Sequence, residues 1–398
     1  HTVRGISSFT HPMFLSFQAD AHDTPNWHQA MNGLNAEGYR NAMDVEIGTL
    51  SGKESWIIVP RTKDMNVLKS TWAFKCKQFP DGQVEKLKAR FCVRGDMQIE
   101  GVDVFDTYAP VVSWTTVRLL FIISLIFNLA TKQVDYTAAF VNAKLEEEIY
   151  VEMPRGYQKD GHVLRLKRSL YGLRQSPRNF FQHLKTILMD NSIGMHQSQC
   201  DPCLFYTSKV ICFVYVDNCL FFAKKGSNTN EVLKQIESKG MQMTIEDDVA
   251  GFLGVLVKKN GNQIELLQEG LIDKIINALG LSRGTAAPTP AEGKCIGKDV
   301  RGELANEHFN YRNVVGMLYY LLNCSQPELS FATSQCARFS NNPTLLHKTA
   351  IKQIGQYLLG EELFATEITS VFLALKVNSL LVIDQGRVGL ESCSTIST

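Results

Sequence analysis

The stretch FVYVDNCLFF, residues 213 to 222, is an apolar run interrupted at its centre by a carboxylate and an amide, Asp217 and Asn218. Apolar residues on both sides are typical of two buried strands, and the Asp-Asn pair between them predicts a two-residue hairpin turn. The predicted hairpin would hold Asp217 at its tip. The rest of the chain has to explain why a charge stands where the pattern otherwise predicts burial.

Length and composition predict a globular protein with a large core. The chain has 398 residues, 44% of them hydrophobic, and this length suggests two to three domains or subdomains. Its longest apolar run, residues 119–130, is shorter than the roughly 20 residues that cross a bilayer, so we expect a core helix and no membrane partner. Because the sequence opens at His1 without a signal segment, we expect a fragment of a longer protein.

The ten cysteines are scattered, which favours a reducing compartment over a disulfide framework. Only Cys200 and Cys203, in the sequence CDPC, have the spacing of a metal-ligand pair, with His196 four residues earlier. A structural zinc site needs four ligands, and no second pair lies at the right distance. Zinc or redox chemistry at this pair is therefore an alternative that lacks ligands.

The net charge of +1 hides two basic stretches. Residues 61–94 contain nine Lys or Arg against three acids, and residues 155–185 contain eight against one. The acidic segment 135–152 lies between them. Basic surfaces around an acidic centre suit a polyanion held beside metal ions, although solvated faces of ordinary helices and strands are the alternative.

The first basic stretch predicts a β-hairpin. TWAFKCKQ (71–78) and VEKLKARFCVRG (84–95) both alternate with period two, and PDG (80–82) supplies the turn. Alternation places the cations on one face, where they can neutralise the phosphates of a triphosphate or a template. These cations include Lys75, Lys77, Lys86, Lys88 and Arg90.

A helix and a strand are expected next. Residues 113–130 predict a helix that starts at Ser113, followed by a loop at Thr131 and Lys132 and a strand that ends at Asp135. An acid at a strand end is a common metal ligand, although a lone Asp is often a helix cap. Two-metal nucleotidyl transfer needs carboxylates from different strands around ions about 3.5–4 Å apart, which makes Asp135 and Asp217 candidate partners.

Several sequence blocks, taken together, are far more specific than any single motif. In chain order they are WAFKCK, VEKLKARFCVRGDMQIEGVDVFDTYAPVV, QVDYTAAFVNAKLEEEIYVEMPRGY, LKRSLYGLRQSPRNFFQHL, DPCLF and VYVDN, with further blocks in 251–276, 311–339 and 347–360. This series resembles the reverse transcriptase of copia-type long-terminal-repeat retrotransposons, from about Trp56 to about Gly360. Because DPCLF is one of the blocks, the resemblance implies a strand entry at the cysteine pair and weakens the zinc alternative.

The resemblance implies an α+β right-hand polymerase fold, with fingers, a palm built on an antiparallel sheet, and a helical thumb. We expect a lead-in segment at 1–45, the fingers and palm as catalytic core at 46–258, and a thumb-like and connecting region at 259–360. The family continues into a ribonuclease H domain, but 361–398 shows no such pattern and has only one aspartate, Asp384. We expect a degenerate or truncated tail there.

The implied activity is RNA-directed DNA polymerisation, in which a primer 3′ hydroxyl attacks a deoxynucleoside triphosphate. Asp135 and Asp217 would be the catalytic metal ligands, for two Mg²⁺ or Mn²⁺ ions. The implied partners are an RNA or DNA template with its primer, deoxynucleoside triphosphates, and a parent polyprotein with integrase and ribonuclease H. By family analogy the protein would be cytoplasmic, in particles, and later nuclear.

The family blocks also assign binding roles. Phe140, five residues after Asp135, corresponds to an aromatic gate that excludes a 2′-hydroxyl, with a core aromatic as the alternative. The expected nucleotide-binding residues are Lys75, Lys77, Lys88, Arg90, Phe140 and Gln175; the expected nucleic-acid-binding residues are Arg174, Arg178, Tyr215 and, at the start of the primer grip, Phe252, Leu253 and Gly254.

Asn218, the third residue of the expected catalytic group, departs from the family pattern, which has a second Asp there. An amide keeps the size and one acceptor oxygen but loses a negative charge and offers no carboxylate to a metal. We therefore expect strongly reduced activity, with Asp135 and Asp217 still able to hold one ion. The alternative is a non-catalytic nucleic-acid-binding relic that retains the polymerase fold.

Overall fold

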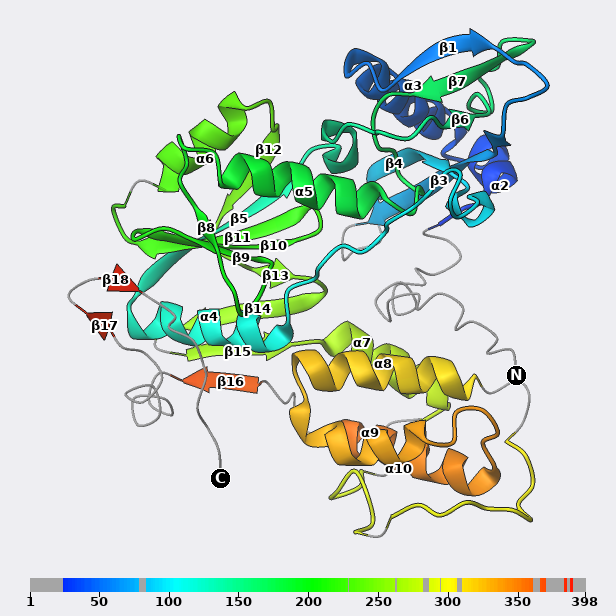
Figure 1. The fold of residues 1–398 in the computed structure, drawn as a ribbon. Helices are drawn as coiled ribbons and strands as arrows, with labels where there is room; N and C mark the ends of the chain where they lie inside the picture. The colour runs from blue at the N-terminus through cyan, green and yellow to red at the C-terminus, as the bar shows by residue number, and fades with distance from the viewer. Residues whose placement is uncertain are drawn as a thin grey trace.

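The computed structural model describes most of the chain as a succession of helices and strands (Figure 1). The first part of the expected lead-in segment, residues 1–23, and nearly all residues after 360 lie outside the described residues, as do the side chains of 77, 78 and 85. The described residues are 24–78, 84–227, 229–261, 263–281, 286–293, 295–305 and 310–360, with the backbone of 366–369, 383–384 and 387–388.

Two helices and a small sheet form the N-terminal unit, to which β6 and β7 return from later in the chain (Figure 1). The expected boundary after residue 45 falls inside α3, whose Met43 and Leu50 are buried in the core of this unit. The helices are α2 (Trp27–Asn32) and α3 (Ala36–Gly52), and the sheet order is β1 (Trp56–Pro60), β7 (His162–Leu166), β6 (Tyr150–Val151) and β2 (Val67–Leu68).

The two strands of the predicted cationic hairpin are confirmed, whereas its expected turn at 80–82 lies outside the described residues. β3 (Ser70–Gln78) pairs antiparallel with β4 (Val84–Val93), and Lys75 lies opposite Lys88 in the register. Trp72 and Phe74 of β3 and Phe91 of β4 are buried in the N-terminal core, because alternate side chains point to the same face of a strand. The cations are therefore left on the opposite face.

A six-stranded antiparallel sheet forms the centre of the molecule, and Figure 1 shows α5 and α4 on its two sides. Its strand order is β12 (Met243–Asp247), β5 (Leu129–Tyr136), β11 (Asn218–Lys224), β10 (Val210–Tyr215), β9 (Leu204–Tyr206) and β8 (His196–Gln197). The surrounding helices are α4 (Trp114–Ile126), α5 (Ser176–Leu188) and α6 (Thr229–Ser238), with short 3-10 turns η1 (Gly95–Met97) and η2 (Ala139–Asn142) in the connections.

The predicted helix over 113–130 is correct at its start and wrong at its end. The Ser113 side chain caps α4 by accepting a hydrogen bond from the backbone N–H of Thr116, as expected. The helix stops at Ile126, the chain turns at Asn128 in a left-handed conformation, and the next strand already begins at Leu129. The segment predicted as a loop is therefore strand, in which Thr131 and Lys132 pair with Phe222 and Phe221 of β11.

The C-terminal part combines a second sheet with a helical unit (Figure 1). The sheet order is β13 (Gly251–Phe252), β14 (Val255–Asn260), β15 (Gln263–Leu267) and β16 (Thr366–Thr369). The helices are α7 (Glu269–Leu279), α8 (Tyr311–Cys324), α9 (Ser330–Ala337) and α10 (Leu345–Gly360), with η3 (Pro327–Leu329) between α8 and α9; β17 (Ile383–Asp384) pairs with β18 (Arg387–Val388).

The α+β class is confirmed by this mixture of antiparallel sheets and helices. Three hydrophobic cores account for it: one around the six-stranded sheet, one in the N-terminal unit and one among α7 to α10. Within the described part of the chain, no helix is both long and apolar enough to cross a membrane.

Candidate active site

The hairpin of residues 213–222 exists, but its turn is one residue earlier than predicted. Tyr215 pairs with Asn218, so the two turn residues are Val216 and Asp217, and Asn218 is the first residue of β11. Val216 adopts a left-handed backbone with φ of 52°, which is unusual for a β-branched side chain. Asp217 remains at the tip, whereas Asn218 belongs to the strand.

The central sheet brings the three expected catalytic residues together. Asn218 on β11 lies directly opposite Asp135 on β5, and the backbone N–H of Tyr136 donates to the Asp217 carbonyl at 3.1 Å. Desolvation, followed by the negative charge of Asp217, raises the pKa of Asp135 above its ordinary value. The acid near the end of β5 and the acid in the β10–β11 turn are thus close enough to interact, although they are 82 positions apart in the sequence.

Asn218 turns its amide toward the neighbouring acid. Its Nδ2 donates to Asp217 Oδ1 at 3.3 Å, so the amide neutralises part of the charge that a metal would otherwise neutralise. Oxygen donors from Asp135, Asp217 and the Asn218 carbonyl suit Mg²⁺ or Mn²⁺. Among the described residues, no group of three or more His, Cys, Asp or Glu side chains is placed to hold a metal ion.

The cationic hairpin lies within electrostatic reach of this acid pair. Lys88 and Arg90 on β4 both lower the pKa of Asp135, against the upward effects of desolvation and Asp217. Lys75, opposite Lys88, is exposed on β3, while the Lys77 side chain lies outside the described residues. Positive charge is therefore available above the acids, where a triphosphate would need it.

Tyr171 interacts both with Arg90 of the cationic hairpin and with the acid pair. It is not among the site residues predicted from the sequence. The Arg90 guanidinium lies over the Tyr171 ring at 4.8 Å from its centroid, and the ring meets Phe140 edge-on at 4.7 Å. Burial, with smaller contributions from Asp217 and Asp135, raises the pKa of Tyr171 to about 12. The residue stands in the block SLYGLRQSP, so its place in that motif was the available signal.

Gly172 allows Tyr171 to sit this close to the hairpin. Its φ of 91° is left-handed, and a Cβ added there would lie 2.0 Å from the Val93 carbonyl oxygen. The Val93 N–H donates to the Tyr171 carbonyl at 2.8 Å, which fastens the end of β4 to this loop. Only glycine fits such a close backbone approach.

The position of Phe140 agrees in part with each of its two interpretations, an aromatic gate and a core aromatic. It is 9% exposed and belongs to the core of the central sheet, where it packs edge-on against Phe180 at 6.2 Å. Its other neighbour, Tyr171, interacts electrostatically with Asp217 and Asp135. Phe140 is thus a core residue at the margin of the candidate site.

Gln175 does not present its side chain to a nucleotide, which corrects the expectation. It is fully buried: its Oε1 accepts from Gln98 Nε2 and its Nε2 donates to the Asp103 carbonyl, both at 2.9 Å. Because this amide is fully buried and both of its ends are bonded inside the protein, it is not presented to a ligand. Nearby Arg174 is exposed, and Arg178 is paired with Asp106 at 2.8 Å.

Phe252 is also a structural residue rather than a surface contact, because its side chain is only 2% exposed. Its ring centroid lies 6.1 Å from that of Tyr215 and 5.4 Å from that of Phe213, so it packs under the catalytic hairpin. Tyr215 is itself buried. Leu253 and Gly254, in contrast, form the turn between β13 and β14.

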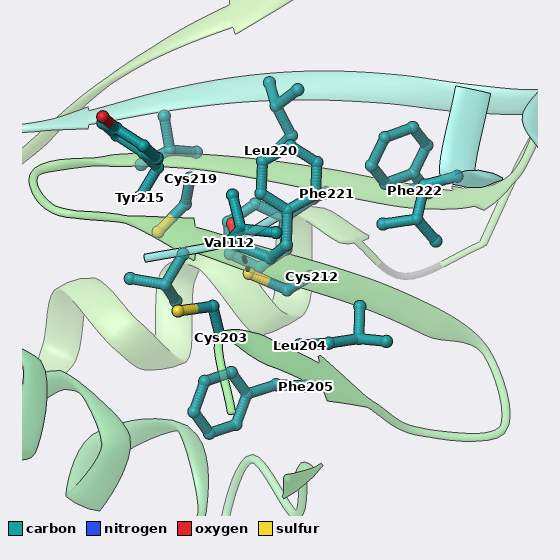
Figure 2. Close-up of a cluster of buried hydrophobic side chains, with 14 of the residues drawn as sticks. Val112, Cys203, Leu204, Phe205, Cys212, Tyr215, Cys219, Leu220, Phe221 and Phe222 are labelled. Carbon is teal, nitrogen blue, oxygen red and sulfur yellow. Dashed lines mark hydrogen bonds between the residues drawn. The ribbon is translucent and has the colours of Figure 1, made fainter. Parts of the chain in front are cut away.

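The segment that contains Cys200 and Cys203 contributes to the packing of the central sheet. Burial raises the pKa of the Cys203 thiol to about 12, and Figure 2 shows this thiol in the buried cluster that also contains Cys212 and Cys219. Asp201, one of the two residues between Cys200 and Cys203, accepts hydrogen bonds from Thr116 Oγ1 at 2.6 Å and from the Cys203 N–H at 2.9 Å. The CDPC segment therefore fastens the start of α4 to the central sheet.

Comparisons with known proteins agree with the sequence resemblance. Residues 53–293 match the family described as reverse transcriptase (RNA-dependent DNA polymerase). The chain is 30% identical over 336 residues to the retrovirus-related Pol polyprotein from transposon TNT 1-94 of Nicotiana tabacum, covering 80% of this chain and 25% of that protein. It is 27% identical over 341 residues to the corresponding polyprotein from transposon RE1 of Arabidopsis thaliana, covering 83% of this chain and 23% of that protein.

The chain thus spans about a quarter of the length of these curated relatives. Among solved structures, it is similar to the foamy viral protease-reverse transcriptase in complex with double-stranded DNA. That similarity has a TM-score of 0.40 at 14% sequence identity and covers 81% of this chain and 48% of that chain.

Proposed function

The chain belongs to the reverse transcriptase (RNA-dependent DNA polymerase) family of copia-type retrotransposons, and from that premise we propose that it extends a primer on an RNA or DNA template. In this proposal a deoxynucleotide is transferred to the primer 3′ hydroxyl at Asp135 and Asp217. The observation that carries the proposal is the pairing of β11 with β5, which places Asn218 directly opposite Asp135. In the same place the backbone N–H of Tyr136 donates a hydrogen bond to the Asp217 carbonyl.

Reverse transcriptases generally use divalent metal ions, and Asp135 and Asp217 would hold Mg²⁺ or Mn²⁺ here. Bound metal would stabilise charge on the transferring phosphate and lower the pKa of the primer hydroxyl, in a two-ion arrangement. The raised pKa of Asp135 supports this assignment, because a cation would relieve the repulsion that contributes to it. Lys75, Lys88 and Arg90 would bind the triphosphate from the opposite side.

The amide at Asn218 limits this activity in the proposal. Two carboxylates and one amide give one negative charge fewer than three carboxylates, so the second ion would bind more weakly. The hydrogen bond from Asn218 Nδ2 to Asp217 Oδ1 competes further for an oxygen that a metal needs. We expect one ion to bind at ordinary concentrations and the other only at high concentrations.

Extension of a DNA primer on an RNA template tests the proposal. The natural chain, Asn218→Asp and Asp217→Ala would be compared across a range of Mg²⁺ and Mn²⁺ concentrations. We expect Asn218→Asp to extend at least about tenfold faster and Asp217→Ala to lose extension, by the 10²- to 10³-fold typical of a lost electrostatic contribution. Equal rates for the natural chain and Asn218→Asp would show that the amide does not limit metal binding.

The second candidate function is nucleic-acid binding without chemistry, which the Asn218–Asp217 hydrogen bond favours because it occupies one carboxylate oxygen that a metal ion would otherwise use. In that case duplex binding would fall steeply with salt, and Lys75→Ala with Lys88→Ala would reduce the slope by about one for each lost phosphate contact. Absence of extension in Asn218→Asp, with binding intact, would favour this alternative. Under either function we propose a parent polyprotein with integrase and ribonuclease H, and location in cytoplasmic particles with later delivery to the nucleus.

A further inference from the structure

Tyr320 on α8 contacts the turn between β13 and β14, far away in sequence. Its hydroxyl donates a hydrogen bond to the backbone carbonyl of Leu253, a residue that is 67 positions earlier. Leu253 and Gly254 are the two residues of this turn, since Phe252 pairs with Val255 across it. Helix α8 of the C-terminal unit therefore contacts the turn next to Phe252, the residue that packs against Tyr215 of the catalytic hairpin.

The turn has a backbone that its sequence does not favour. Leu253 and Gly254 have φ of 53° and 73°, the left-handed pair that a two-residue type I′ hairpin turn requires. Gly254 tolerates this freely, whereas a leucine is strained in that conformation. Such a turn keeps its shape only when surrounding contacts determine it.

Leu253 packs against the core of the central sheet, whereas the turn borders a pocket on the side facing α7. A cavity of about 340 Å³ lies there, with Gly254 and Tyr320 in its wall. The remaining lining residues are Leu256, Leu267, Gln268, Glu269, Gly270, Leu271 and Lys274. Because packing is incomplete on this side, the hydrogen bond from Tyr320 carries more of the constraint.

The C-terminal end of α8, one turn beyond Tyr320, is fastened to α4. The Arg118 side chain of α4 donates to the carbonyls of Asn323, and of Cys324 at 3.3 Å, which are the last residues of α8. On the other side of the turn, Phe252 packs against Tyr215, two residues before Asp217. The contacts run continuously from α8 through the turn to the catalytic hairpin.

We propose that Tyr320 is a positioning residue that couples the C-terminal helical unit to the Leu253–Gly254 turn and, through Phe252 and Tyr215, fixes the position of the hairpin that carries Asp217. The inference rests on the proposed polymerase function. Tyr320 acts through the turn and touches no reacting atom. Removing its hydroxyl leaves the strained turn free to relax, which shifts the Asp217 hairpin without weakening the affinity of the chain for the duplex.

Tyr320→Phe tests this, because it removes only the hydroxyl. Tyr319→Phe is the matched control, since Tyr319 is the adjacent residue of α8 and packs on the C-terminal helical core. Hydrogen exchange of the 251–256 amides would be measured without nucleic acid. Primer extension would be measured in the natural chain and in the Asn218→Asp background, with kcat, KM for primer–template and duplex Kd determined separately. Melting temperatures would verify that both variants are folded.

We expect exchange at 251–256 to quicken about fivefold to tenfold in Tyr320→Phe alone, in line with the loss of one hydrogen bond. We also expect kcat to fall about fivefold with KM and duplex Kd unchanged. Equal behaviour of the two variants would overturn the inference, and so would faster exchange with unchanged kcat. If no chain extends a primer, Asn218→Asp included, the proposed function and the positioning role in catalysis both fail, while the exchange comparison still decides whether Tyr320 holds the turn.

Discussion

Asp135 faces Asn218 directly across the β5–β11 ladder, so the residue that departs from the family pattern is the cross-strand neighbour of the first acid. Directly opposed side chains in an antiparallel pair have Cβ atoms about 4.5–5.5 Å apart. A carboxylate at position 218 would therefore add a second like charge beside Asp135, in addition to Asp217. The amide avoids that repulsion, and in the proposed function the same change would weaken metal binding.

Asn218→Asp should make folding depend on metal. Without divalent ions we expect the variant to be less stable than the natural chain by up to about 1 kcal/mol, the range for like charges opposite each other in a sheet. Saturating Mg²⁺ should reverse the order, since a ligand at a hundred times its Kd stabilises by about 2.7 kcal/mol. Thermal melting with chelator and with Mg²⁺ measures both. A metal-induced shift of equal size in the natural chain would contradict the prediction.

Glu46→Gln should change the pH dependence of stability. Glu46 accepts a hydrogen bond from the Phe91 N–H at 3.2 Å, and desolvation raises its pKa despite that bond and the nearby Arg90. A raised folded-state pKa means that stability is fully present below the unfolded pKa and is lost as pH rises through the folded pKa. Glutamine keeps the acceptor without the charge.

The Glu46→Gln variant should therefore gain stability relative to the natural chain as pH rises from about 4.5 to 7, by no more than about 1 kcal/mol. Urea unfolding at several pH values gives the difference. Glu37→Gln, on the same helix and exposed to solvent, is the control that should show no such trend. A constant difference at all pH values would mean that the charge of Glu46 is not what distinguishes the variants.

Local pattern predicted the elements of the site but not its exact register. Alternation predicted both hairpins, and a serine predicted the start of α4, because these signals lie within a few residues. The turn was displaced by one residue because Val216 adopts a backbone that its side chain disfavours. Burial of Gln175 depends on Gln98 and the Asp103 carbonyl, more than seventy positions away, which no local pattern contains.

Phe140→Val should separate the two roles of this ring. Loss of packing against Tyr171 and Phe180 should lower stability by about 2–3 kcal/mol, as for other shortened core side chains. If the ring also excludes a 2′-hydroxyl, incorporation of ribonucleotides should rise at least about tenfold relative to deoxynucleotides. Phe180→Leu, a fully buried neighbour, should lower stability without relaxing that selection. Equal selectivity in the two variants would leave Phe140 with a packing role alone.

Gln175→Leu should impair folding and leave nucleotide affinity unchanged. Its amide bonds Gln98 and the Asp103 carbonyl inside the protein, so leucine removes two buried hydrogen bonds, while Gln98 Nε2 keeps its own bond to the Asp103 carbonyl at 3.1 Å. Each lost hydrogen bond costs about 0.5–1.5 kcal/mol, and we expect a loss of about 1–3 kcal/mol in urea unfolding. Arg90→Ala is the converse case, because Arg90 is exposed over Tyr171 and should raise KM for the deoxynucleotide with a smaller loss of stability. If Gln175→Leu raises KM for the deoxynucleotide at temperatures where the variant is fully folded, Gln175 contacts the nucleotide directly, contrary to what its burial indicates.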